Sequence, residues 1–183
     1  MNAKIVGTVL VILIIVAIGG YLLTVQNQQT QVTEDLSPNE QVSKTDIEVT
    51  ENPPPGFKGK VLAGEIPYVT DFVKSDYDQV KNSDNLIVLY FYANWCPVCR
   101  EEILKFYSAF DELSKDSNKY AKVVGFRVNY NDSDTDEDET ALAKEFGVAY
   151  QHTKVFIKKG IRILKSPESW EKQRYLDEIN RAI

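Results

Sequence analysis

Cysteine and histidine are scarce in this sequence: its 183 residues contain two cysteines and one histidine. Only two residues separate the cysteines, whereas small secreted domains stapled by disulfides carry more cysteines at wider spacings. That class of protein is therefore excluded. A single Cys-x-x-Cys pair is typical of a redox pair or of half a metal site, and no second pair is present to complete a four-cysteine zinc site.

Basic residues are fewer than acidic residues. Lysine and arginine number 21 against 27 aspartates and glutamates, which gives a formal net charge of -6. Because phosphate groups attract basic surfaces, this balance argues against a nucleic acid or an anionic membrane surface as the main partner. The length suits one ordinary globular domain with segments to spare.

Charge is absent from Ile5 to Val25. As a helix rising about 1.5 Å per residue, this run is roughly 30 Å long and predicts a transmembrane anchor over residues 5–25. Small residues at Ala17-Ile18-Gly19 leave a cleaved signal peptide as the alternative, but the apolar run continues beyond them, which favours an uncleaved anchor. No cysteine follows the run, so a lipid-modified cysteine is excluded as the anchor.

The few charges near this segment predict its orientation. Lys4 precedes it, and no further lysine or arginine occurs before Lys44. The positive-inside tendency then places residues 1–4 in the cytosol and the rest outside, in a single-pass protein of the cytoplasmic membrane. Residues 26–56 are polar and lack a sustained hydrophobic period, so we expect a disordered linker, stiffened at its end by Pro53-Pro54-Pro55.

Residues 57–183 alternate between strand-like and helical patterns, which predicts an α/β domain with a mixed central sheet flanked by helices. Lys159-Gly160 is expected to turn a hairpin, and Ser166 to cap a last helix with Pro167 at its first position. Glu102 is expected on a polar face of its helix and Ile183 in the core. The expected strands are 66–69, 86–92, 122–128, 155–158 and 161–164. The expected helices are one around 72–82, one that opens at Cys96 and carries apolar residues from Ile103 to Leu113, one from about 138 to 147, and a last one that begins at 167.

The motif Trp95-Cys96-Pro97-Val98-Cys99 follows the apolar strand Leu86–Tyr92 and opens an amphipathic helix. This arrangement resembles the active site of the thioredoxin superfamily, specifically its membrane-anchored extracytoplasmic members. The resemblance implies a thioredoxin-like fold for residues 57–183. It also implies that Cys96 is the more exposed cysteine and that Trp95 shields the pair.

The chemistry of the pair follows from its place at a helix start. Disulfide exchange needs a thiolate, and unpaired backbone N–H groups and the helix dipole stabilise an anion at Cys96. Pro97 suits the first turn because it has no N–H to lose, and Cys99 comes round to face Cys96. We therefore expect Cys96 to attack and Cys99 to resolve, with no cofactor besides their disulfide. The alternatives are an inert disulfide and half of a zinc site.

Two positions depart from the family pattern. Tyr90 replaces a buried acid six residues before the nucleophile, and a neutral phenol cannot act as a base near pH 7, so fast reductase turnover is not expected. His152 replaces the cis-proline before Thr153, and we expect a trans peptide there. His152 could be a cation or acid–base group beside the cysteines, a ligand in a copper or zinc site with Cys96 and Cys99, or a loop residue without chemistry.

Six acids are concentrated between Asp132 and Glu139. Asp132, Asp134 and Asp136 fit the first ligand spacings of a calcium loop. The sixth position is Glu137 where glycine is needed, and the twelfth is Ala143 where glutamate is needed. A solvated loop leading into a helix is the preferred interpretation.

The leading hypothesis is a membrane-tethered thiol–disulfide oxidoreductase that exchanges disulfides with cysteine-containing proteins outside the cytoplasmic membrane. It implies protein substrates with thiols or disulfides, a separate redox partner and a monomer. Two alternatives belong to other classes. One is a copper- or zinc-binding metallochaperone that uses Cys96, Cys99 and His152, and the other is a non-enzymatic thioredoxin-like scaffold.

Overall fold

A six-stranded mixed sheet forms the centre of the protein. The computed structural model describes residues 55–183, so the predicted anchor at 5–25 and nearly all of the predicted linker at 26–56 lie outside the described residues. In the sheet the strand order is β1-β2-β4-β3-β5-β6, with β2, β4 and β3 parallel and the other pairs antiparallel. The strands are β1 (Val61–Ala63), β2 (Tyr68–Asp71), β3 (Leu86–Tyr92), β4 (Val123–Asn129), β5 (Thr153–Lys158) and β6 (Ile161–Ser166).

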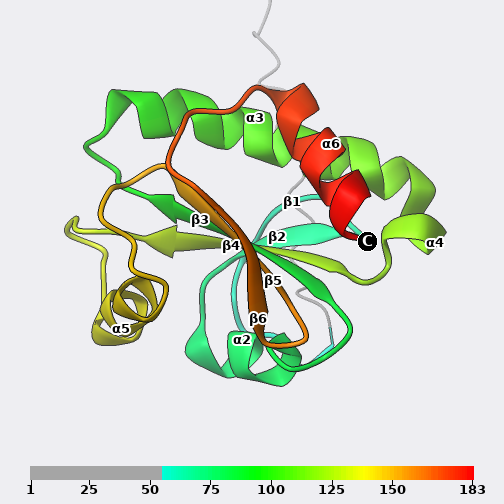
Figure 1. Ribbon diagram of the computed structural model, residues 1–183, viewed down its shortest axis with the longest axis horizontal. Helices are drawn as coiled ribbons and strands as arrows, with labels where there is room; N and C mark the ends of the chain where they lie inside the picture. Colours follow the sequence, from blue (N-terminus) through cyan, green and yellow to red (C-terminus); the bar gives the residue numbers. More distant parts are fainter. Residues whose placement is uncertain (1–54) are drawn as a thin grey trace, which may run out of the picture. The chain divides into compact units, whose positions relative to one another are not determined.

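Helices cover both faces of this sheet, as predicted. Helices α3 and α6 lie on one face, and α2 and α5 lie on the other (Figure 1). The helices are α2 (Lys74–Val80), α3 (Pro97–Leu113), α4 (Ser117–Tyr120), α5 (Glu137–Glu145) and α6 (Lys172–Ala182), with the 3₁₀ turn η1 (Ser114–Asp116) between α3 and α4. None of the helices in residues 55–183 is long and apolar enough to cross a membrane.

Strand β3 is buried on both faces, which explains its unbroken apolar run. Leu86, Val88 and Tyr90 pack in the core beneath α3 and α6. Ile87, Leu89 and Phe91 pack in the second core, on the side of α2 and α5. A strand flanked by neighbours and covered by helices has no polar face, so period-2 alternation is absent from its sequence. Because β3 lies between the two cores, the chain that follows it starts at the boundary of both cores.

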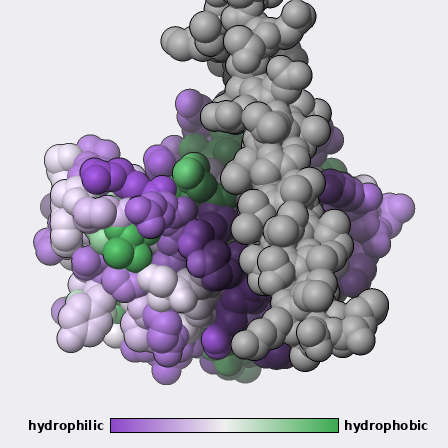
Figure 2. Space-filling view, turned by 90° about the horizontal axis from the view of Figure 1, so that it is seen from above, coloured by the Kyte–Doolittle hydropathy of each residue, from purple (hydrophilic) through white to green (hydrophobic). Residues whose placement is uncertain are grey.

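The hairpin between β5 and β6 is confirmed. Lys159 and Gly160 both have positive φ, 53° and 74°. Two-residue turns of this kind match the twist of antiparallel strands. The surface seen from above is largely hydrophilic, with hydrophobic side chains in small separate patches (Figure 2).

The predicted start of the last helix is wrong. Ser166 is the last residue of β6, and α6 begins only at Lys172, with Glu171 at its N-cap. Pro167 therefore lies in the connection, where Trp170 turns into the core and donates its indole N–H to the Ser166 hydroxyl at 3.0 Å. The buried indole of Trp170 holds this connection in place. The local sequence pattern does not predict this burial. Ile183 is exposed at the end of α6, so its predicted place in the core is also wrong.

Two further differences concern the first strands. Strand β2 begins at Tyr68, two residues after its predicted start, because Ile66 is exposed and Pro67 has no N–H to donate to a neighbouring strand. The short strand β1 was not predicted. Its three residues are too few to display a period, and it pairs with β2 at the sheet edge.

The acidic segment is a capped loop. Asp136 is the N-cap of α5 and accepts a hydrogen bond from the N–H of Glu139, while the Glu139 carboxylate accepts one from the N–H of Asp136. Asp132 accepts hydrogen bonds from the N–H groups of Asn94 and Asp134. These carboxylates therefore cap backbone groups and satisfy the α5 N-terminus, in agreement with the preferred interpretation of the loop.

Candidate active site

The cysteine pair lies where the chain leaves β3 and enters α3. Beyond Tyr92, the N–H of Asn94 donates to Asp132 at 2.8 Å, which ties this turn to the loop after β4. The N–H of Cys96 donates to the carbonyl of Ala93 at 3.1 Å, so the chain is already turning when it reaches the motif. The strand and the acidic loop together position Cys96.

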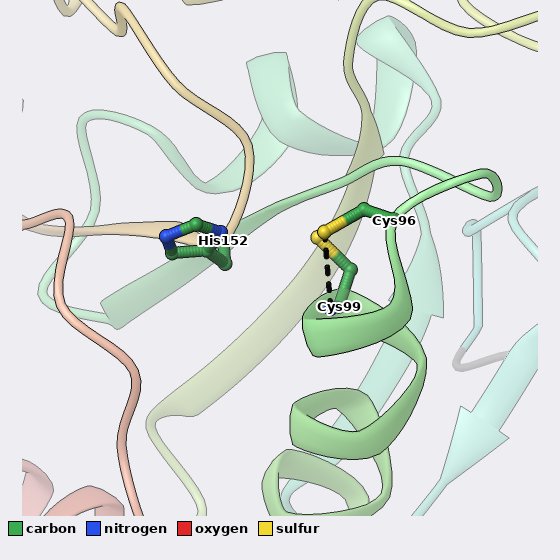
Figure 3. Close-up of side chains that lie close together, drawn as sticks. All are labelled: Cys96, Cys99 and His152. Atoms are coloured by element: carbon green, nitrogen blue, oxygen red, sulfur yellow. Dashed lines mark hydrogen bonds between the residues drawn. The ribbon is translucent and has the colours of Figure 1, made fainter.

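Cys96 is the N-cap of α3. Its sulfur accepts a hydrogen bond from the N–H of Cys99 at 3.3 Å (Figure 3). Pro97 occupies the first turn, as expected. The sulfur thus faces a backbone donor that has no carbonyl partner within the helix. Cys96 is 4% exposed and Cys99 is 0% exposed. Solvent reaches Cys96 first.

Cys99 has a thiol that resists ionisation. Burial raises its pKa to about 12, and the hydrogen-bonded interaction with Cys96 acts in the same direction. The Cys99 thiol is therefore protonated at neutral pH and must give up its proton before it can attack a sulfur. A nearby proton acceptor is needed for that step.

His152 lies beside the two cysteines, on the loop that precedes β5 (Figure 3). One ring nitrogen and the sulfurs of Cys96 and Cys99 all lie within 4.8 Å of one another. The backbone of His152 has a φ of 52°, and its N–H donates to the carbonyl of Phe91 at 2.6 Å. Within residues 55–183 the one cis peptide bond is Ile66–Pro67, so the bond before His152 is trans, as predicted.

The imidazole of His152 is partly buried. Burial lowers its pKa, so the ring is neutral at pH 7. Its Nδ1 atom is buried and has no hydrogen-bond partner among residues 55–183. A neutral imidazole with its proton on Nε2 has a lone pair at this buried Nδ1 atom.

Other residues near the cysteines and His152 in the chain are mostly exposed. Trp95 is 51% exposed, and its indole N–H donates to the carbonyl of Asn131 at 3.0 Å. Val98 and Tyr150 are also exposed. Thr153 is buried and donates its hydroxyl proton to the carbonyl of Tyr150 at 2.7 Å, which closes the turn that holds His152.

A buried ion pair below the site was missed by sequence reasoning. Lys154 lies opposite Tyr90 in the β3–β5 register, and its ammonium donates to the Glu102 carboxylate at 2.6 Å. The same Glu102 oxygen accepts the hydroxyl of Tyr175 and the N–H of Trp170, each at 2.8 Å. Glu102 is therefore buried in a polar cluster, and its predicted place on a solvent-facing side of α3 is wrong.

The cluster extends to the backbone of His152. Lys154 donates to the carbonyl of His152 at 2.9 Å and also to the carbonyl of Glu168. Burial lowers the pKa of Lys154, while the Glu102 carboxylate opposes this shift. One sequence signal could have found Lys154: it has the same strand parity as Phe156, which packs in the core.

Residues 68–182 match the sequence profile of a family described as Thioredoxin. The chain belongs to the thioredoxin family. A curated relative, thioredoxin H4 of Arabidopsis thaliana, is 41% identical over 83 residues, which cover 45% of this chain and 60% of that protein. The alignment thus spans less than two thirds of the relative's length.

Solved structures show the same fold. Thioredoxin f from spinach chloroplast, in its short form, has a TM-score of 0.51 and 20% identity, and the match covers 66% of this chain and 98% of that one. The zinc-bound form of human ERp44 has a TM-score of 0.50 and 18% identity, with 62% of this chain and 31% of that one covered. At these identities the likeness concerns the fold alone.

Tyr90 occupies the predicted place of the buried acid in this thioredoxin domain. It is fully buried, and burial followed by the Glu102 charge raises its pKa, so the phenol stays neutral. Its hydroxyl has no hydrogen-bond partner within the described part of the chain. This thioredoxin domain therefore has no carboxylate at that position of β3, and the buried acid below the site, Glu102, is paired with Lys154.

Proposed function

We propose that the protein is a thiol–disulfide oxidoreductase, with Cys96 as the attacking thiol and Cys99 as the resolving thiol. The proposal rests chiefly on the sulfur of Cys96, which caps the first turn of α3 in a thioredoxin-family domain and lies next to Cys99. Exchange requires a thiolate nucleophile, and the Cys96 sulfur already accepts a hydrogen bond from a backbone N–H at the start of the helix.

The exchange proceeds in two displacements. The thiolate of Cys96 attacks one sulfur of a substrate disulfide, which forms a mixed disulfide and releases the other substrate sulfur as a thiolate. Cys99 then loses its proton and attacks the Cys96 sulfur, which forms the Cys96–Cys99 disulfide and releases the second substrate thiolate. The substrate gains two electrons and the pair loses two, and the reverse sequence oxidises a dithiol substrate.

His152 is the proposed proton acceptor for Cys99. Tyr90 cannot take this proton because its phenol is already protonated, whereas a neutral imidazole nitrogen lies within 4.8 Å of the Cys99 sulfur. Burial favours the neutral ring before the step. His152 would thus act as the proton acceptor for the resolving thiol, a role that a buried acid has in the family pattern.

The substrates are proposed to be proteins. Trp95, Val98 and Tyr150 are exposed apolar or aromatic side chains next to the cysteines and His152 in the chain. Exposed aromatic side chains of this kind are common at protein-binding surfaces. A substrate segment lying across them would bring its sulfur to Cys96.

The site of action is proposed to be outside the cytoplasmic membrane. The uncharged run at residues 5–25, the single lysine before it and the polar linker at 26–56 support a tethered domain on that side. Disulfides persist in such a compartment, so turnover requires a redox partner there. Membrane fractionation tests the tether, because a protein lacking residues 5–25 should move from the membrane to the soluble fraction.

Disulfide exchange with a protein substrate tests the activity directly. The wild-type protein should exchange disulfides with a reduced or oxidised substrate, and Cys96→Ser should abolish the reaction. Ser108→Ala, on the exposed side of α3, serves as the matched control and should exchange at the wild-type rate. Equal rates for wild type and Cys96→Ser would reject the oxidoreductase assignment and favour a scaffold.

A further inference from the structure

Three potential metal ligands converge on one point of the domain. The sulfurs of Cys96 and Cys99 come from the start of α3, and a ring nitrogen of His152 comes from the loop before β5. All three atoms lie within 4.8 Å of one another. Thiolate and imidazole bonds to a first-row metal are about 2.0–2.3 Å long, so bound ligand atoms stand roughly 3.5–4 Å apart. The distances between the ligand atoms need to shorten by roughly 1.3 Å at most for the cluster to enclose an ion.

The histidine is held where a ligand is needed. Its N–H donates to the carbonyl of Phe91 at 2.6 Å, and its carbonyl accepts from the buried ammonium of Lys154 at 2.9 Å. Its φ of 52° is uncommon for a residue other than glycine. These two anchors fix the backbone on both sides of the ring, so the imidazole is presented to the thiols by the fold.

One nitrogen of the ring makes no hydrogen bond to the described residues. Nδ1 is buried without a hydrogen-bond partner among residues 55–183. A buried polar atom left unpaired costs free energy, and such atoms call for an explanation in a role such as ligation. A metal ion bonded to the imidazole would explain why a histidine stands here.

The ligand set favours Cu(I) over Zn(II). Two thiolates and one imidazole are soft or borderline donors, and thiolates select Cu(I) or zinc. Structural zinc sites use four protein ligands, but no fourth histidine, cysteine or carboxylate joins this cluster in the described range 55–183. Three ligands around Cu(I) therefore fit the site better.

We propose that the reduced protein binds one Cu(I) ion through the sulfurs of Cys96 and Cys99 and a ring nitrogen of His152. The site forms only with the dithiol, because the Cys96–Cys99 disulfide has no thiolate to offer. The same two cysteines therefore cannot bind the metal and take part in disulfide exchange at the same time. Copper binding needs only the three ligands and does not depend on the protein being an active oxidoreductase.

Competition for Cu(I) tests the site. The reduced full-length protein is titrated with Cu(I) in oxygen-free buffer against the chelator bathocuproine disulfonate. We expect one Cu(I) per chain, with affinity at least tenfold lower in His152→Asn, a replacement chosen because asparagine tolerates positive φ. Gln151→Ala is the matched control from the same loop and should keep the wild-type affinity. Equal affinities for wild type and His152→Asn would overturn the three-ligand site.

X-ray absorption at the copper edge gives a second readout. The wild-type complex should contain two sulfurs and one nitrogen at bonding distance, and His152→Asn should lose the nitrogen. Two sulfurs alone in the wild type, or one copper shared by two chains, would also overturn the proposal. Exchange assays keep the two proposals apart: a protein that exchanges disulfides but binds no Cu(I) refutes only the copper site. One that binds Cu(I) through all three ligands but cannot exchange disulfides refutes only the oxidoreductase.

Discussion

The ammonium of Lys154 lies 2.6 Å from the carboxylate of Glu102, and the two side chains are 0% and 2% exposed. The pair joins β5 to α3 directly beneath the active site. Removing two charges from water is costly, and their attraction offsets that cost only while both partners are present. The pair therefore links the element that holds His152 to the helix that holds the cysteines.

Breaking this pair should destabilise the domain strongly. Lys154→Met leaves the Glu102 carboxylate buried without its cation, so the free energy of unfolding should fall by about 3–5 kcal/mol. The double variant Lys154→Met/Glu102→Gln removes both charges and keeps an acceptor for Trp170 and Tyr175. Its loss should be smaller than the sum of the single losses. Chemical denaturation followed by fluorescence measures all three values.

A surface ion pair provides the control for that experiment. Lys105 and Glu171 are 2.6 Å apart but solvent-accessible, so Lys105→Met should change the stability far less than Lys154→Met does. Additive losses in the double variant, or equal losses for Lys105→Met and Lys154→Met, would show that the buried charges are not coupled.

Glu139 should make stability depend on pH. Burial raises its pKa from 4.5 to about 7, although backbone N–H groups of Asp136 and Asn129 oppose the shift. The folded state therefore binds this proton more tightly than the unfolded chain does. The stabilisation is full below about pH 4.5, declines as the pH rises towards 7 and is lost above it. We expect Glu139 to account for a loss of about 1–3 kcal/mol between pH 5 and pH 8.

The contribution of Glu139 can be isolated by substitution. Glu139→Gln is neutral throughout, so its free energy of unfolding should vary less between pH 5 and pH 8 than that of the wild type. Glu137→Gln, on the exposed side of the same helical turn, should keep the wild-type dependence. Parallel pH curves for wild type and Glu139→Gln would contradict the prediction.

The two cysteines should differ in reactivity. Cys99 is fully buried and its pKa is raised to about 12, whereas Cys96 is slightly exposed. Iodoacetamide added to the reduced, folded protein at pH 8 should therefore modify Cys96 at least about tenfold faster than Cys99. Mass spectrometry of peptides taken at successive times measures both rates. Denatured protein is the control, and there the rates should converge.

Gly125 should not tolerate a side chain. A Cβ at this position would lie 2.9 Å from the ring of Phe110 and 2.9 Å from a methyl group of Val69. Gly125→Ala therefore overpacks the contact between β4, β2 and α3 and should cost about 1–3 kcal/mol of unfolding free energy. Thermal and chemical denaturation measure the loss. A stability equal to that of the wild type would mean that the contact between these elements is loose.

The sequence predicted those parts of the fold that local patterns encode. The apolar run of β3, the turn at Lys159-Gly160 and the helix start at Pro97 each depend on residues close together in the chain, and each is confirmed. The start of α6 depends instead on Trp170 packing beneath distant residues, so the capping signal at Ser166 was misleading. Tertiary burial overrode local capping preference there.

The residues of the candidate site were also predictable only where they depend on neighbours close in the chain. Cys96 and Cys99 were identifiable because they are adjacent to the strand and helix that position them. The approach of His152 was predictable only from the family layout, since it comes from a loop more than fifty residues away. Glu102 and Lys154 were missed because charged residues are assigned to the surface unless a partner is known, and their partners are each other.

The most direct test of the account is to trap the reaction halfway. In Cys99→Ser the resolving thiol is gone, so a protein disulfide substrate should remain covalently attached to the domain. Non-reducing electrophoresis detects the adduct, and mass spectrometry of its peptides should place the bond at Cys96. An adduct that forms equally well with Cys96→Ser, or none with Cys99→Ser, would contradict the assignment of Cys96 as the nucleophile.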